Sequence, residues 1–177
     1  WDITQQLYNY RDTYGLPTEG YRTADGWDSP TTKLKGHGSG HYMSALAFAF
    51  ASCTDPETDL SKEKNELRER IRRMVNELRE CQERTFVWDS TLNRYKEARD
   101  YAPEEELKKM KGNWAAFNEY KKDYKNYGYG YLNAIPAAHP ALIECYRAYN
   151  NEEWVWAPYY TIHKQLAGLI DIANNID

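Results

Sequence analysis

The sequence places a helix with almost no polar face directly before a helix with a single apolar stripe. Residues 40–52 predict the first helix, because small alanines alternate with Leu and Phe from Met43 to Ala51. A helix that is apolar on every side is buried. Residues 56–82 predict the second helix, in which Asp55 would be the N-cap and Pro56 the first helical residue. Its apolar set follows the i, i+4, i+7 spacing of one face and comprises Leu67, Ile71, Met74, Val75, Leu78 and Cys81.

The remaining segments also predict helices. Weaker patterns predict helices at residues 2–11, 103–124 and 140–149, and residues 127–132 predict an aromatic–glycine loop. A final helix is predicted at residues 160–174, with an apolar side made of Ile162, Leu166, Leu169, Ile170 and Ala173. Strand signals are nearly absent. We therefore expect a single all-α domain over residues 1–177, with inner apolar helices alternating with outer amphipathic ones.

Composition and charge exclude several partners. The net charge is -4 and the basic residues are interleaved with Glu in 62–84 and 108–125, a pattern typical of solvated helix faces rather than a phosphate-binding groove. We therefore expect no nucleic-acid partner. No apolar run reaches the length of a membrane span, so no membrane insertion is expected. The 16 Tyr and 6 Trp suit stacking on sugar rings or bases, although Tyr also tolerates half-buried positions.

The cysteines and paired histidines do not predict a metal site. Cys53, Cys81 and Cys145 fit no metal or redox spacing, and we expect three buried structural thiols. His37 and His41 are four residues apart and would share one face of a helix. The glycines around them instead predict a loop that enters a helix, and no acidic third ligand is near. His139 has no role that the sequence suggests.

Two histidine-bearing segments, residues 36–42 and 156–164, each precede an apolar helix. Helix N-termini point unpaired N–H groups outward, so polar side chains there can face a pocket. If the two helix starts converge, they form a polar, ring-lined cavity suited to a hydroxyl-rich ligand. The alternative for His163 is a core histidine with one hydrogen bond. The acids that lie off the charged helices show no catalytic pairing in sequence, and they are Asp25, Asp28, Glu144, Glu152 and Asp171.

Three landmarks in order resemble the β-L-arabinofuranosidase group, glycoside hydrolase families 127 and 146. The first is Trp27-Asp28 followed by Gly36-His37-x-x-Gly40-His41-Tyr42-x-Ser44-Ala45-Leu46. The second is Cys81-Gln82 followed by Gly130-Tyr131-Leu132-Asn133-Ala134. The third is Trp156-Ala157-Pro158-Tyr159-Tyr160-Thr161-x-His163-Lys164-x-x-Ala167-Gly168-Leu169-x-Asp171. The family's link within the second landmark is usually short, so residues 83–127 are expected to be an insertion.

The resemblance implies a fold and a chemistry. It implies an (α/α)6 toroid, of which this chain would be the N-terminal half. It also implies retaining hydrolysis by a cysteine thiolate beside zinc, which Glu and further Cys residues hold. Those residues would lie beyond the third landmark, and Cys53, Cys81 and Cys145 match none of them. We therefore expect no catalytic residue, no metal and no cofactor in this chain, and no activity from these 177 residues alone.

The resemblance also assigns a sugar-binding role. It places His163 in the subsite, with His37, His41, Tyr131, Trp156 and Tyr160 at the same end. The substrate class it implies is an L-arabinofuranoside of an arabinose-containing plant glycan. Two alternatives stay open: another α/α-toroid enzyme, such as an unsaturated-uronide hydrolase or a lyase, and a non-catalytic helical carbohydrate-binding or scaffold domain. The chain starts at Trp1 without Met and shows no signal peptide, so we expect it to be processed or cut from a longer protein. Separately, we expect an extracytoplasmic location, periplasmic or secreted.

Overall fold

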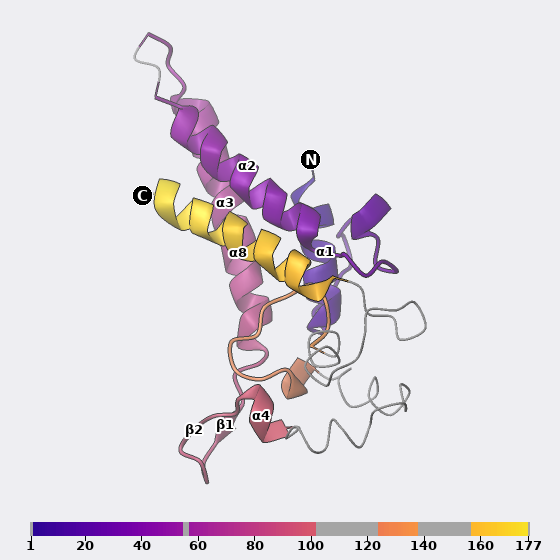
Figure 1. Cartoon of the computed structure of the whole chain (residues 1–177). Helices are drawn as coiled ribbons and strands as arrows, with labels where there is room; N and C mark the ends of the chain where they lie inside the picture. Colours follow the sequence, from indigo (N-terminus) through magenta and orange to yellow (C-terminus); the bar gives the residue numbers. More distant parts are fainter. Residues whose placement is uncertain (1, 55–56, 102–123, 138–156, 177) are drawn as a thin grey trace.

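The computed structural model describes residues 2–54, 57–101, 124–137 and 157–176 (Figure 1). This part of the chain is mostly helical and contains α1 (Ile3–Thr13), α2 (His37–Ser52), α3 (Ser61–Glu83), α4 (Ala98–Tyr101) and α8 (Pro158–Asn175). Two short 3-10 helices are η1 (Gly26–Asp28) and η2 (Tyr124–Asn126). The helix predicted at 140–149 lies outside the described residues, as does nearly all of the one predicted at 103–124. Within the described ranges, every helix is too short or too polar to cross a bilayer.

Helices α2 and α8 lie side by side and touch backbone to backbone (Figure 1). A Cβ atom built on Gly40 would lie 2.3 Å from the carbonyl oxygen of Lys164. One built on Gly168 would lie 2.5 Å from the carbonyl oxygen of Gly40. Further along, the Ser44 hydroxyl donates to the Asp171 carboxylate at 2.6 Å. Only glycine fits at both contact positions, so these two residues set the distance between the helices.

The amphipathic stripe predicted for α3 is confirmed. Its buried residues are Ile71, Met74, Leu78 and Cys81, which pack toward α1 and α2. The predicted start of this helix is wrong, because the helix begins at Ser61 rather than at Pro56. The carboxylate of Asp59 accepts from the Ser61 N–H at 3.1 Å and fixes the chain at this later point.

The prediction that the first apolar helix is buried all round is wrong, because Phe48 of α2 is 54% exposed on a face that no described helix covers. In α8, two residues of the expected apolar side, Leu166 and Ile170, are 52% and 57% exposed, whereas Leu169 packs against the core. The buried residues of α8 are Pro158, Thr161, Gln165, Gly168 and Ile172. Gly168 lets the backbones of α2 and α8 meet on this face, because it carries no side chain.

The loop after η2 is anchored on the end of α1. The Tyr14 hydroxyl donates to the Tyr131 carbonyl at 2.9 Å and accepts from the Asn133 N–H at 3.0 Å. The Thr13 hydroxyl donates to the Ala134 carbonyl at 2.8 Å. Gln165 of α8 donates to the Asn133 side chain at 2.8 Å. The loop therefore joins α1 to α8 through buried hydrogen bonds. Breaking one of them would leave a buried polar group without a partner, which lowers the free energy of unfolding.

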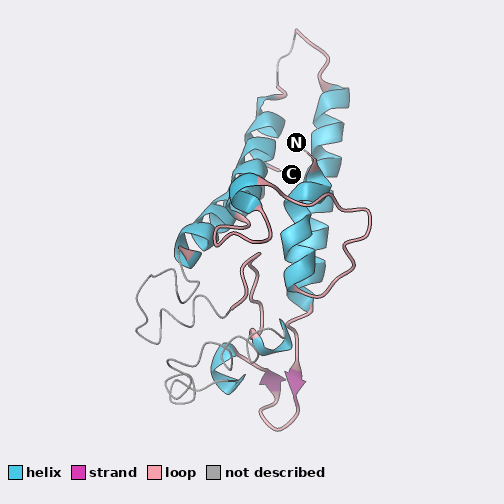
Figure 2. Ribbon diagram, turned by 90° about the vertical axis from the view of Figure 1, so that its right-hand side faces the viewer, coloured by secondary structure: helices cyan, strands magenta, loops and turns pink. Residues whose placement is uncertain are grey.

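A short antiparallel hairpin follows α3, although the sequence showed almost no strand signal (Figure 2). Strands β1 (Trp88–Asp89) and β2 (Arg94–Tyr95) pair Trp88 with Tyr95 and Asp89 with Arg94. The Asp89 carboxylate closes the turn by accepting from the Thr91 and Leu92 N–H groups at 2.8 and 3.1 Å. Asn93 takes the positive φ of 51° that the turn requires. Two-residue strands leave too short a pattern to read from sequence.

We expect Gly168→Ala to destabilise the protein through the α2–α8 contact. Alanine normally gains about 1 kcal/mol over glycine inside a helix. Overpacking against backbone costs about 1–3 kcal/mol, so the free energy of unfolding should fall, as measured in urea. Ala45→Ser is the matched control, because it adds one heavy atom to the exposed face of α2. An increase in stability for Gly168→Ala would show that the two helices do not touch here.

Candidate functional site

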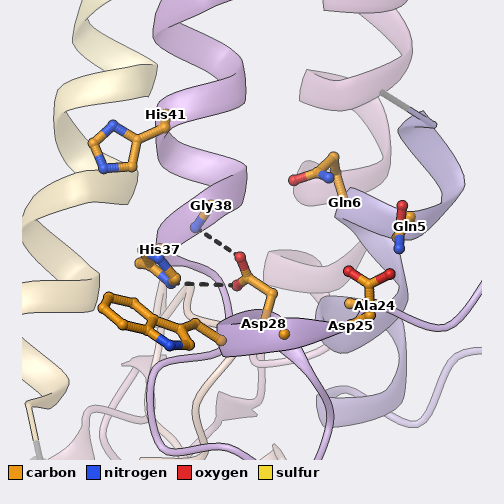
Figure 3. Close-up of a pocket in the computed structure, with 10 residues that line it drawn as sticks. Gln5, Gln6, Ala24, Asp25, Asp28, His37, Gly38 and His41 are labelled. Carbon is orange, nitrogen blue, oxygen red and sulfur yellow. Dashed lines mark hydrogen bonds and ion pairs between the residues drawn. The ribbon is translucent and has the colours of Figure 1, made fainter.

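A cavity of about 560 Å³ opens beside the N-terminus of α2 (Figure 3). Three elements line it. Helix α1 contributes Gln5 and Gln6, the segment around η1 contributes residues 24–28, and α2 contributes His37, Gly38 and His41. The lining therefore combines two amides, two carboxyl groups, two imidazoles and the indole of Trp27. Such a mixture of hydrogen-bonding groups with an exposed ring suits a hydroxyl-rich ligand.

Asp28 caps α2 from a distant position in the chain. The helix is preceded by Gly36 at φ 97°, which has no side chain to act as a cap. The Asp28 carboxylate instead accepts from the Gly36 N–H at 2.6 Å and from the Gly38 N–H at 3.0 Å. A carboxylate at a helix N-terminus is favoured by the helix dipole. The Asp28 carboxylate lies so close to the helix that a Cβ on Gly38 would be 2.0 Å from one of its oxygens. Position 38 therefore needs a residue without a side chain.

The Asp28 cap is itself tied to α1. The Asn9 amide donates to the Asp28 carbonyl at 2.6 Å, so η1 is held against α1. Burial raises the pKa of Asp28, and this effect is opposed by the N–H groups of Gly36 and Gly38 and by the two nearby histidines. One side of the cavity is therefore a carboxyl group that stands in a fixed position.

His37 is the centre of a cluster of rings. Its ring centroid lies 6.1 Å from that of Trp27, 6.2 Å from that of His41 and 6.2 Å from that of Tyr160. The Nδ1 atom of His37 lies 2.9 Å from the Leu34 carbonyl. Because a carbonyl oxygen can only accept, Nδ1 carries the hydrogen, and in the neutral ring Nε2 is an acceptor. The structure therefore brings together three predicted residues, His37, His41 and Tyr160.

The prediction that the glycines form a loop and that the helix starts at residue 40 is wrong. Helix α2 begins at His37, so His37 and His41 share one helical face. The helix starts this early because the cap comes from Asp28, which stabilises a glycine-containing first turn that has weak helix propensity.

The other predicted residues lie elsewhere. His163 is exposed on α8 and is not among the described residues that line the cavity, and its exposure disfavours a core role. Tyr131 lines a second cavity of about 270 Å³, beside Gln82 and Gln165, and its hydroxyl donates to the Ile135 carbonyl at 2.8 Å. Trp156 lies outside the described residues. The sugar-binding roles of all six residues stay predictions.

Sequence reasoning missed several residues of the cavity. Asp25 and Asp28 lie off the charged helices, but nothing near them in sequence indicates a helix cap. Trp27 and Asp28 belong to the first landmark, which is a usable signal. Gln5 and Gln6 carry no signal, because adjacent glutamines on a short helix are ordinary surface residues.

The described residues do not fit a zinc site. No group of three or more Cys, His, Asp or Glu residues in the described ranges is close enough to hold a metal ion. Burial raises the pKa of the Cys81 thiol to about 12, so this side chain is a protonated thiol at neutral pH. Cys53 is only partly buried, contrary to the prediction, because it follows the last residue of α2. Cys145 lies outside the described residues.

Comparison with known protein families gives one match. A family model described as the β-L-arabinofuranosidase GH127 catalytic domain matches residues 1–123. The matched range includes every residue that lines the cavity beside α2. Loop 127–137 and α8 lie beyond it. No curated protein and no solved structure matches the chain.

We expect His41 to make the protein less stable in acid. Burial, then Lys164 and His37, hold the pKa of His41 below its ordinary value of 6.5. The unfolded chain therefore takes up this proton at a higher pH than the folded chain does, and stability falls as the pH drops below about 6.5. The ring signals of His41 in an NMR titration should show a midpoint below 6.5, and His41→Gln should lessen the acid destabilisation. A midpoint above 6.5 would contradict the assigned environment.

Proposed function

The chain belongs to the family of GH127 β-L-arabinofuranosidase catalytic domains, and on that premise we propose that it forms the N-terminal part of a glycoside hydrolase and supplies part of its sugar-binding subsite. The proposed substrate is an L-arabinofuranoside of an arabinose-containing glycan. The observation that carries the proposal is the family match over the whole cavity beside α2.

The groups in the cavity support sugar binding. A neutral His41 and the Nε2 atom of His37 can accept hydrogen bonds from sugar hydroxyls, and the amides of Gln5 and Gln6 can both donate and accept. The exposed indole of Trp27 offers a flat face for the C–H groups of a furanose ring. We assign the first contacts to His37, His41 and Tyr160. The family resemblance adds His163, Trp156 and Tyr131 to the proposed subsite.

The exposed apolar faces of α2 and α8 support a larger helical assembly. Phe48 on α2 and Leu166 and Ile170 on α8 are more than half exposed, which is unusual for large apolar side chains on neighbouring inner helices. We propose that further helices of an (α/α)6 toroid cover these faces. In that arrangement α2 and α8 are inner helices and α3 is an outer one.

The buried thiol of Cys81 is unsuited to act as the nucleophile. A cysteine nucleophile in a glycosidase needs a lowered pKa, whereas burial raises the pKa of Cys81. We propose that the nucleophile and its zinc come from residues beyond this chain. The described residues would then bind and orient the arabinofuranosyl ring and hold its hydroxyls in place.

We expect these 177 residues alone to bind no stoichiometric zinc and to release no 4-nitrophenol from 4-nitrophenyl β-L-arabinofuranoside, whereas the full-length protein turns this substrate over. Elemental analysis after dialysis and an absorbance assay measure the two properties. Turnover by the isolated chain that is lost in Cys53→Ala, Cys81→Ala or Cys145→Ala would show that the nucleophile lies within these 177 residues. An inactive full-length protein would favour the non-catalytic carbohydrate-binding module.

We expect His163→Ala in the full-length protein to lower kcat/KM by roughly 5- to 150-fold, because removing a hydrogen bond in a closed pocket costs about 1–3 kcal/mol. The melting temperature should hardly change, since His163 is exposed. Asn174→Ala, exposed on the same helix, is the matched control and should leave both values unchanged. Wild-type kcat/KM in His163→Ala would remove His163 from the subsite.

A further inference from the structure

A second group of rings lies outside the cavity, on the hairpin that follows α3 and on the loop after η2 that is attached to it. It consists of Phe86, Trp88, Tyr95 and Tyr129, which we call the aromatic platform. The rings of Tyr95 and Tyr129 are stacked at 4.7 Å with an interplanar angle of 2°. Phe86 lies 4.6 Å from Tyr129, and Trp88 meets Tyr95 edge-on at 5.3 Å. Phe86 also lies 5.6 Å from Tyr95, so the four rings form one compact cluster.

The aromatic platform is exposed. Trp88 is 55%, Tyr129 50% and Tyr95 37% accessible to solvent. Three large rings that stack on each other while facing water gain little from burial, so their stacking contributes little to the hydrophobic core. Clustered exposed aromatic groups commonly mark a binding surface.

The backbone and neighbouring charges hold the aromatic platform in place before any ligand arrives. The Tyr129 N–H donates to the Lys96 carbonyl at 2.8 Å, and the Lys96 N–H donates to the Val87 carbonyl at 2.8 Å. These bonds attach the loop that carries Tyr129 to the hairpin that carries Trp88 and Tyr95. The Arg79 guanidinium lies 5.2 Å from the centre of the Phe86 ring. A surface held in this way loses little entropy on binding.

We propose that the aromatic platform is a second carbohydrate-binding site, which binds glycan residues remote from the arabinofuranosyl unit in the cavity. The exposed ring of Trp88 and the exposed parts of the Tyr95 and Tyr129 rings can contact the C–H faces of sugar rings. The adjacent ion pair of Lys96 with Asp89, at 3.5 Å, offers hydrogen-bonding groups to hydroxyls at the rim. The proposal rests on the proposed function only in naming the arabinose-containing glycan as the ligand.

Charged side chains flank the rings of the aromatic platform, including Arg79, Asp89 and Lys96, and offer hydrogen-bonding groups to sugar hydroxyls. Aromatic residues and Arg are also enriched in protein–protein interfaces, so self-association is the competing outcome that the test below separates.

The test is affinity electrophoresis of the full-length protein in native gels that contain soluble arabinan or arabinogalactan. We expect Trp88→Ala and Tyr95→Ala each to weaken retardation by the glycan by about 3- to 10-fold, from the loss of one aromatic contact. Trp88→Phe should keep most of the binding, because it retains a ring. Leu92→Ala is the matched control, as an exposed apolar residue of the same hairpin without a ring.

Hydrolysis of 4-nitrophenyl β-L-arabinofuranoside separates this proposal from the proposed function. Trp88→Ala should keep the wild-type kcat/KM on this small substrate, which cannot span both sites. Unchanged retardation in both alanine variants would overturn the second site even if the enzyme is active. If the glycan retards the wild-type protein more than Trp88→Ala but the full-length protein does not hydrolyse the substrate, the second site stands and the proposed hydrolase function is wrong. A dimer in size-exclusion chromatography that Trp88→Ala dissociates would assign the aromatic platform to self-association.

Discussion

The backbone contact between α2 and α8 is the constraint on which the rest of the described structure depends. Gly40 and Gly168 let the two helices approach until a single added carbon would collide with a carbonyl oxygen. This closeness brings the first turn of α8 to the first turn of α2, so that Tyr160 meets His37 although the two residues are far apart in sequence. It also turns Gln165 inward, where it reaches Asn133 and joins the loop that follows η2. The ring cluster is thus a consequence of helix packing.

The second requirement is a charge at the start of α2. A glycine-rich first turn is a poor helix former, and the Asp28 carboxylate compensates by accepting from two of its N–H groups. The same carboxylate stands 3.6 Å from the Nδ1 atom of His37. One residue therefore both starts the helix and borders the cavity. Asn9 holds this residue against α1, which brings Gln5 and Gln6 to the opposite wall.

Sequence reasoning worked where the signal was local. The stripe of α3 repeats over several turns, and the apolar pattern of α8 placed that helix to within two residues at its start. It failed where the decisive partner was remote. The packed face of α8 depends on Gly40, and the start of α2 depends on Asp28, eight residues before Gly36. Two histidines and a tyrosine of the site were found from sequence, whereas Gln5 and Gln6 are recognisable only once α1 lies beside η1.

The central claim is that the cavity at the start of α2 receives an arabinofuranosyl ring. A crystal structure of the full-length protein with bound L-arabinose tests it most directly. The account predicts sugar density within hydrogen-bonding distance of His37 and His41, with the ring beside Trp27. Sugar bound with no contact to α2 or η1, in a protein whose α2 still begins at His37, would contradict the account.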